Sequence, residues 1–209
     1  MKTGLIDHDR ISGAIRGAES KTSGEIYCVL ARSSSSYFFP SAFVIAVAML
    51  LVSAVLVWVL EWRWYTLDAR NLVVAQILAF AAALLVLWLA PWLRIRLVPK
   101  RVRYERAHEN AIKQFLARNI HLTEARTGVL IFVSLAERYA EVVADSGINA
   151  KVDQAEWNGI VAGLTVSARE DRLTDGFVDA VKSVGDLLAR HFPWRTDDRN
   201  ELDDHLVEI

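Results

Sequence analysis

The chain has 209 residues, of which 53% are hydrophobic and 23% are charged, and its formal net charge is −1. This length accommodates one domain, or one domain with a membrane anchor. The near-zero charge argues against a basic nucleic-acid binder, so we expect no nucleic-acid partner. The one cysteine, Cys28, excludes an intramolecular disulfide, as is usual in a reducing compartment.

The first 36 residues predict a helix followed by a strand. Asp7–Thr22 spaces apolar residues as an amphipathic helix does, and Ser23-Gly24 ends it. Glu25–Ala31 is apolar on both faces and rich in β-forming residues, which predicts a buried strand with Cys28 in the core. The serines of Ser33–Ser36 predict a short flexible joint.

Two apolar runs, Ser41–Leu60 and Leu72–Leu93, follow this joint. A helix that crosses the hydrocarbon core of a bilayer needs about 20 apolar residues, and both runs have that length. A long charged segment precedes the first run, which excludes a signal peptide. The runs therefore predict a transmembrane hairpin in a lipid bilayer, with only a local kink at Pro91 near the end of its helix.

The positive residues around the hairpin predict its orientation. The connecting segment Glu61–Asn71 carries only Arg63 and Arg70, whereas both outer flanks are richer in arginine and lysine (Arg16, Lys21, Arg32; Arg94, Arg96, Lys100, Arg101, Arg103, Arg106). The positive-inside rule then places both termini in the cytoplasm, in a multi-pass protein of the inner (plasma) membrane. An aromatic belt in the connecting segment would lie at the opposite interface (Trp62, Trp64, Tyr65).

The remaining residues predict a second set of helices and strands. We expect an amphipathic helix over Tyr104–Asn119, a β-hairpin of Gly128–Leu135 and Tyr139–Asp145, a helix from Asp153 to Ser167, and a last helix from Thr174 or Asp175. Asp153 with Glu156 three residues later resembles a capping box. After Pro193 the chain is acidic, and we expect it to be extended or loosely docked.

A lone N-terminal strand would leave its backbone groups unpaired, so we expect it to complete the C-terminal sheet. The predicted fold class is α/β, an α+β sandwich whose small mixed sheet is flanked by helices, with an inserted transmembrane hairpin. Glu25–Ala31 would lie parallel to Gly128–Leu135. We expect residues 1–36 and 97–192 to form the split domain and residues 193–209 the acidic tail. The hairpin would span residues 37–96, with its helices at about 41–60 and 72–93.

The chain resembles the TPM domain in this order of segments: a helix and then TSGEIYCVL, and later TGVLIFVSLAERYAEVVADSGI followed by a helix with a tryptophan and a final helix. This is the domain shared by thylakoid-lumen and photosystem-repair proteins and by many bacterial membrane-associated proteins. The resemblance implies a small α/β sandwich with a mixed sheet. Typical members carry the domain uninterrupted and outside the cytoplasm, whereas this chain divides it and its charge bias points inward.

The resemblance also raises a hydrolase hypothesis, because some plant members are linked with acid phosphatase activity and divalent-ion binding. Asp145, Asp153 and Glu156 are the candidate metal ligands, since carboxylates hold hard cations. Asn149 and Gln154, however, stand where the family usually has acids. Asp145 and Asp153 could equally cap a turn and a helix, so we favour structural roles and assign no catalytic residue.

We therefore expect a membrane-anchored, non-catalytic interaction or scaffold domain without a cofactor, acting with a membrane protein partner at the cytoplasmic face. The alternative is a divalent-metal-dependent, phosphatase-like hydrolase. A transporter subunit is disfavoured, because two helices without an intramembrane charge provide no pathway.

Overall fold

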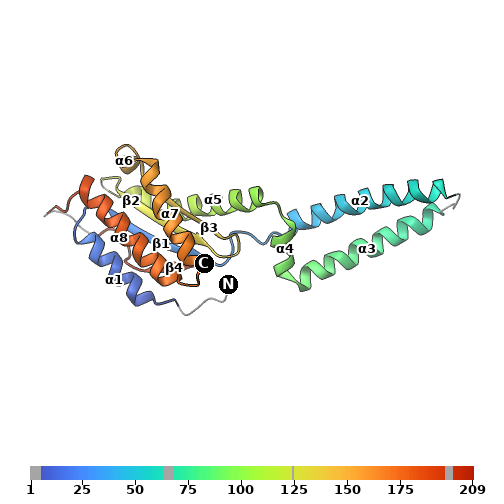
Figure 1. The fold of residues 1–209 in the computed structure, drawn as a ribbon, viewed down its shortest axis with the longest axis horizontal. Coiled ribbons are helices and arrows are strands. Elements are labelled where there is room, and N and C mark those ends of the chain that lie inside the picture. Colours follow the sequence, from blue (N-terminus) through green and yellow to red (C-terminus); the bar gives the residue numbers. More distant parts are fainter. Residues whose placement is uncertain (1–5, 64–67, 124, 196–199) are drawn as a thin grey trace. The chain divides into compact units, whose positions relative to one another are not determined.

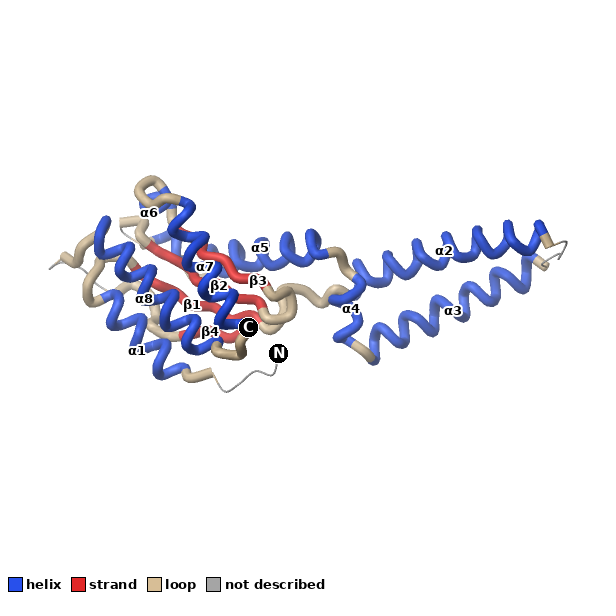
Figure 2. Tube along the Cα trace, in the orientation of Figure 1, coloured by secondary structure: helices blue, strands red, loops and turns tan. Residues whose placement is uncertain are grey.

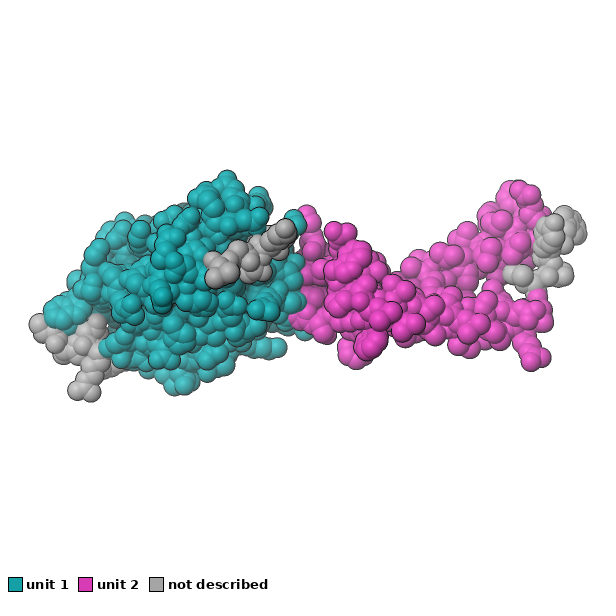
Figure 3. All heavy atoms as spheres, turned by 90° about the horizontal axis from the view of Figure 1, so that it is seen from below, with its two compact units in different colours: residues 1–34, 104–209 teal, residues 35–103 magenta. Residues whose placement is uncertain are grey.

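The protein is a mixed α/β structure. The computed structural model describes residues 6–63, 68–123, 125–195 and 200–209. It divides into two compact units, one of residues 1–34 and 104–209 and one of residues 35–103 (Figure 3). The first unit is thus built from both ends of the chain.

A four-stranded sheet forms the centre of the first unit, with strand order β3-β2-β1-β4 (Figures 1 and 2). β1 (Glu25–Ala31) and β2 (Gly128–Ser134) pair in parallel, in a register that places Cys28 opposite Ile131. β3 (Tyr139–Ala144) pairs antiparallel with β2, and β4 (Leu206–Glu208) pairs parallel with β1. The predicted pairing of the N-terminal strand with the first strand of the β-hairpin is therefore confirmed.

The larger core lies between one face of the sheet and three helices. These are α1 (His8–Glu19), α7 (Gln154–Arg169) and α8 (Leu173–His191). In Figure 1 they lie side by side in front of the strands. Alternate strand residues meet apolar helix residues in one buried cluster (Ile26, Cys28, Leu30, Val129, Ile131, Val133; Ile11, Ile15, Trp157, Phe177, Val181, Val184, Leu188). Cys28 is fully buried in this cluster, as predicted.

The opposite face of the sheet has a smaller cover of α5 (Lys100–Ala117) and the 3₁₀ turn η1 (Ile120–Leu122). Ala111, Phe115 and Ile120 pack against the other set of strand side chains (Tyr27, Val29, Leu130, Phe132). The sheet is therefore apolar on both faces, which is the pattern that a buried strand requires. Gly128 opens β2 because a Cβ there would lie 2.3 Å from the carbonyl oxygen of Ile120.

The second unit contains α2 (Phe38–Trp62), α3 (Ala69–Leu89) and the short α4 (Pro91–Leu97). α2 and α3 are both long and apolar enough to cross a membrane, and their most apolar 18-residue windows are 0% and 6% buried. Trp62 ends α2 and is exposed, whereas Trp64 and Tyr65 lie outside the described residues. Such exposed apolar surface suggests membrane association.

The expected local kink at Pro91 is a break between two helices. α3 ends at Leu89, and Pro91 begins α4. Proline lacks the amide hydrogen that would continue α3 and disfavours helical geometry at the residue before it; Ala90 accordingly has φ −121° and ψ 76°. Arg94 satisfies the free carbonyls at the end of α3, because its guanidinium donates to Leu87 O at 2.8 Å and to Trp88 O at 3.1 Å.

The acidic C-terminal segment contains an element that its composition did not predict. β4 extends the sheet beyond β1, and Ile209 N donates to Leu30 O at 3.0 Å. Leu206 points into the main core, and Val207 packs on the opposite cluster. Alternation over so few residues is too short to be recognised in a charged context.

Replacing the core residue Ile26 tests the position of β1 in the sheet. Ile26 is fully buried, so Ile26→Asp places an unpaired charge in the core and should cost on the order of several kcal/mol. We expect loss of a cooperative thermal transition in the full chain, measured by circular dichroism. Lys113→Asp, on the exposed side of α5, is the matched control and should melt close to the wild type. Equal melting of the two variants would contradict a central β1.

Candidate functional site

The carboxyl ends of β1 and β2 meet at one edge of the sheet, where open α/β sheets usually place their sites. Glu137 lies there and is 2% exposed. Its carboxylate accepts hydrogen bonds from Ser34 N at 3.0 Å, from Ser33 Oγ at 3.3 Å and from Ser134 Oγ. The predicted flexible joint is thus wrong at its first residues, because Ser33 and Ser34 are held by this buried carboxylate.

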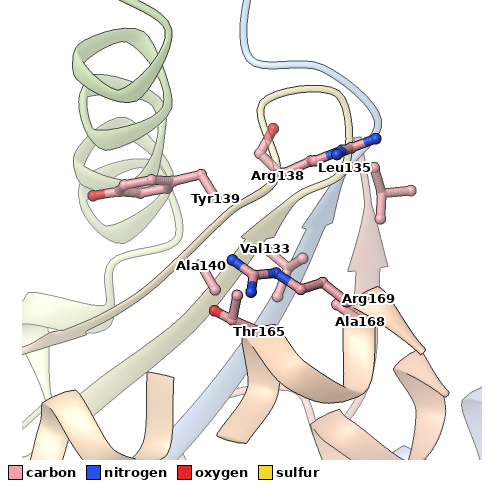
Figure 4. Close-up of a pocket in the computed structure, with 9 residues that line it drawn as sticks. Val133, Leu135, Arg138, Tyr139, Ala140, Thr165, Ala168 and Arg169 are labelled. Carbon is pink, nitrogen blue, oxygen red and sulfur yellow. The ribbon is translucent and has the colours of Figure 1, made fainter. Parts of the chain in front are cut away.

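A cavity of about 260 Å³ lies beside the same edge, between the β2–β3 turn and the C-terminal part of α7. We call it the β2–β3 pocket; its lining residues are Val133, Ser134, Leu135, Arg138, Tyr139, Ala140, Thr165, Ala168 and Arg169. Arg138 has φ 54° in the turn between the strands. Figure 4 shows Arg169 reaching from α7 toward Ala140, and Arg138 extending along the turn near Leu135. The pocket therefore combines an apolar floor with two guanidinium groups.

Asp145, the first candidate metal ligand, directly follows β3 and caps the short helix α6 (Ser146–Asn149). It is 7% exposed, and its Oδ1 accepts hydrogen bonds from the backbone N–H and hydroxyl of Ser146. Its Oδ2 is buried and has no hydrogen-bond partner among the described residues. Gly147 in the same turn is needed for space, because a Cβ there would lie 2.6 Å from Arg126 O. Asp145 thus has a structural role and one free acceptor.

The other two candidates occupy the first turn of α7 and its cap. Asp153 is the N-cap residue of α7 and is exposed, but its side chain does not make the expected capping hydrogen bond. Glu156 forms an ion pair with Arg190 of α8 at 3.0 Å. Across the described residues, no group of three or more histidine, cysteine, aspartate or glutamate side chains is close enough to hold a metal ion. Asp145 and Glu156 therefore have different partners, Ser146 and Arg190.

A partly buried carboxyl group, Glu19, lies at the amino end of β1. Burial raises the pKa of Glu19 from its usual 4.5 to about 9; the hydrogen bond from Ile26 N opposes this rise, and the nearby carboxylates of Glu25 and Asp204 add to it. The three carboxyl groups line one cavity of about 210 Å³. Glu19 is accordingly protonated at neutral pH, which lets these acids approach one another.

Cys28 is unsuited to nucleophilic chemistry, because burial raises the pKa of its thiol far above the usual range. Sequence patterns singled out neither Glu137 nor the pair Arg138 and Arg169. The one available signal for Glu137 was its place in the tight turn between two predicted strands. Arg138 and Arg169 are far apart in the chain, and they line the same pocket only because α7 packs on β3.

This arrangement defines a mixed α/β domain whose concave site lies at the carboxyl edge of its sheet. Residues 93–187 match the family model of the TPM domain, so the predicted resemblance is confirmed. The NMR structure of BA42 protein from the psychrophilic bacterium Bizionia argentinensis has a similar fold, with a TM-score of 0.60, 19% sequence identity and coverage of 100% of this chain and 99% of that one. No curated protein matches this sequence.

Glu19→Gln tests the protonation of the partly buried carboxyl group. Because the pKa of Glu19 in the folded protein lies above its usual 4.5, the folded state holds a proton that the unfolded chain releases between pH 4.5 and about 9. The free energy of unfolding contributed by Glu19 therefore falls as pH rises through that window. Glutamine keeps the acceptor for Ile26 N and removes this dependence, so it should stabilise the protein at pH 8 by on the order of 1–3 kcal/mol.

Melting temperatures of the wild type and Glu19→Gln between pH 5 and 9 would measure this effect, with the exposed Glu105→Gln as the control. We expect the two curves to converge near pH 5 and to separate as pH rises. A variant that is less stable than the wild type by the same amount at every pH would mean that Glu19 is ionised in the folded protein.

Proposed function

We propose that this chain is a membrane-anchored, non-enzymatic interaction domain, held by its helical hairpin at the cytoplasmic face and acting on a membrane protein partner. The observation that carries the proposal is the insertion of two apolar, exposed helices between β1 and β2, which are neighbours in one sheet. The chain thus leaves and re-enters the domain at the hairpin. A domain with two covalent connections to the bilayer is confined to its surface.

The orientation rests on charge. Arginine and lysine are concentrated in α4 and the first half of α5, whereas the turn between α2 and α3 has only Arg63 and the first turn of α3 only Arg70. On α4, Arg96 lies over the ring of Trp92 at 5.1 Å, a pairing of cation and aromatic ring that suits the headgroup region. These features support a cytoplasmic TPM domain.

The non-catalytic assignment rests on the contacts of the candidate acids. Asp145 caps α6 and Glu156 pairs with Arg190, so neither carboxylate is held ready for a substrate. One observation favours the alternative of a metal-dependent, phosphatase-like hydrolase. The free Oδ2 of Asp145 is a buried acceptor, which a cation could satisfy with further ligands from water or substrate.

Labelling of intact cells with a membrane-impermeant maleimide tests the orientation. Glu61→Cys, at the exposed end of α2, should react because we place it outside the cytoplasm; Gln154→Cys, exposed at the start of α7, should react only after cell lysis. The native Cys28 is fully buried, so the chain without an added cysteine should not react and serves as the negative control. Labelling of Gln154→Cys but not Glu61→Cys in intact cells would contradict the cytoplasmic placement.

A phosphatase assay tests the non-catalytic assignment. We expect the purified full chain to hydrolyse p-nitrophenyl phosphate no faster than buffer, with Mg²⁺, Mn²⁺ or Ca²⁺ present, because Asp145 and Glu156 are engaged in structural contacts. Metal-dependent turnover that disappears in Asp145→Asn, persists in Glu105→Gln and is accompanied by unchanged melting temperatures would establish the hydrolase instead.

A further inference from the structure

The two guanidinium groups of the β2–β3 pocket are available to a ligand. Arg138 and Arg169 are exposed, and neither forms an ion pair with any residue that the structure describes. The acids nearest to them in the chain have other partners: Glu137 binds the serines of the β1 end, Glu170 pairs with Arg172, and Glu141 accepts from His108 and Tyr139. Two guanidinium groups therefore lie at the pocket edge without an ion-pair partner among the described residues.

The floor between these arginines is apolar. Val133 is 3% exposed, and Ala140 and Ala168 pack against the main core. Thr165 adds no free donor, because its hydroxyl donates to Val161 O at 2.8 Å. A cavity of about 260 Å³ lies just below the range of about 300–1,000 Å³ usual for drug-sized ligands, so its occupant must be small. The pocket suits an aliphatic group with an anionic end.

The position of the pocket on α7 selects the kind of anion. Arg169 is the last residue of α7, where the helix dipole places partial negative charge. That end of a helix disfavours a dianion, in contrast to the helix N-terminus that phosphate sites use. A carboxylate carries a single negative charge and accepts two parallel hydrogen bonds from one guanidinium. A carboxylate therefore fits this position better than a phosphate does.

We propose that the β2–β3 pocket binds a carboxylate that carries a small aliphatic group, of the size of one leucine residue. The same chemistry occurs at the C-terminus of a protein that ends in an aliphatic residue and in a free short-chain acid. The carboxylate would be the group that the proposed interaction domain recognises, so this site rests on the proposed function. Arg169 also stabilises the end of α7, so its test needs a readout besides stability.

Matched probes measure the contribution of the carboxylate charge to binding separately from that of the apolar group. The full chain in lipid nanodiscs would be titrated by calorimetry with acetyl-Val-Leu carrying a free carboxylate, with the same dipeptide as its amide, and with hexanoate. We expect the free acid to bind roughly tenfold or more tightly than the amide, because only the acid forms charge-assisted hydrogen bonds. Tighter binding of the dipeptide acid than of hexanoate identifies a protein C-terminus; tighter binding of hexanoate identifies a free acid.

Variants place the ligand in the pocket. Arg169→Gln and Arg138→Gln should each weaken binding of the acid roughly tenfold and leave the amide unchanged. Ala168→Leu should abolish binding by filling the floor, with a thermal melt to confirm the fold. Lys182→Gln removes the same charge from an exposed site on α8 and should bind as the wild type does. Equal affinity for acid and amide, or an unchanged affinity in both arginine variants, would overturn the carboxylate site. The maleimide labelling tests the membrane-anchored role separately.

Discussion

The parallel pairing of β1 with both β2 and β4 is the constraint on which the rest of the molecule depends. All seven residues of β1 are buried, and both of its neighbours come much later in the chain. Backbone donors and acceptors buried in such a strand must be paired, because leaving them unpaired costs about as much as losing a hydrogen bond each. The N-terminal segment is therefore part of the same compact unit as β2, β3 and β4.

This pairing explains how a two-helix insertion is compatible with a folded domain. The chain departs after β1 and returns through α5, which covers the second face of the same sheet. The residues at the point of departure are held in place: Glu137 binds Ser34, and Ala136 N donates to Arg32 O at 3.1 Å. The carboxyl edge of the sheet is thereby ordered, and it also forms one wall of the β2–β3 pocket.

Much of the fold could be predicted because burial leaves a pattern in local sequence. β1 and β2 are continuous apolar runs, and α2 and α3 are too long and too apolar for an ordinary core helix. β4 could not be predicted, since it is short, lies in an acidic segment and is stabilised by tertiary contacts, namely its pairing with β1 and the packing of Leu206 and Val207. The break at Ala90 was signalled by Pro91, but whether proline kinks or ends a helix depends on tertiary contacts such as those of Arg94.

The candidate site was less predictable for a physical reason. Asp145 and Asp153 were recognisable because capping acids occupy set positions at the ends of elements. The protonation of Glu19 depends on its burial beside Asp204, and the β2–β3 pocket depends on α7 packing on β3; both are tertiary relations. A sequence pattern records the spacing of residues along one element and carries no information on such juxtapositions.

The completion of the sheet by the N-terminal segment is tested most directly by comparing two water-soluble proteins without the helical hairpin. One joins residues 1–34 to residues 104–209 through a flexible linker, and the other has residues 104–209 alone. Urea unfolding followed by tryptophan fluorescence should show a cooperative transition for the joined protein and none for the C-terminal part. If the C-terminal part unfolds as cooperatively and at the same urea concentration, β1 is dispensable and the divided-domain account is wrong.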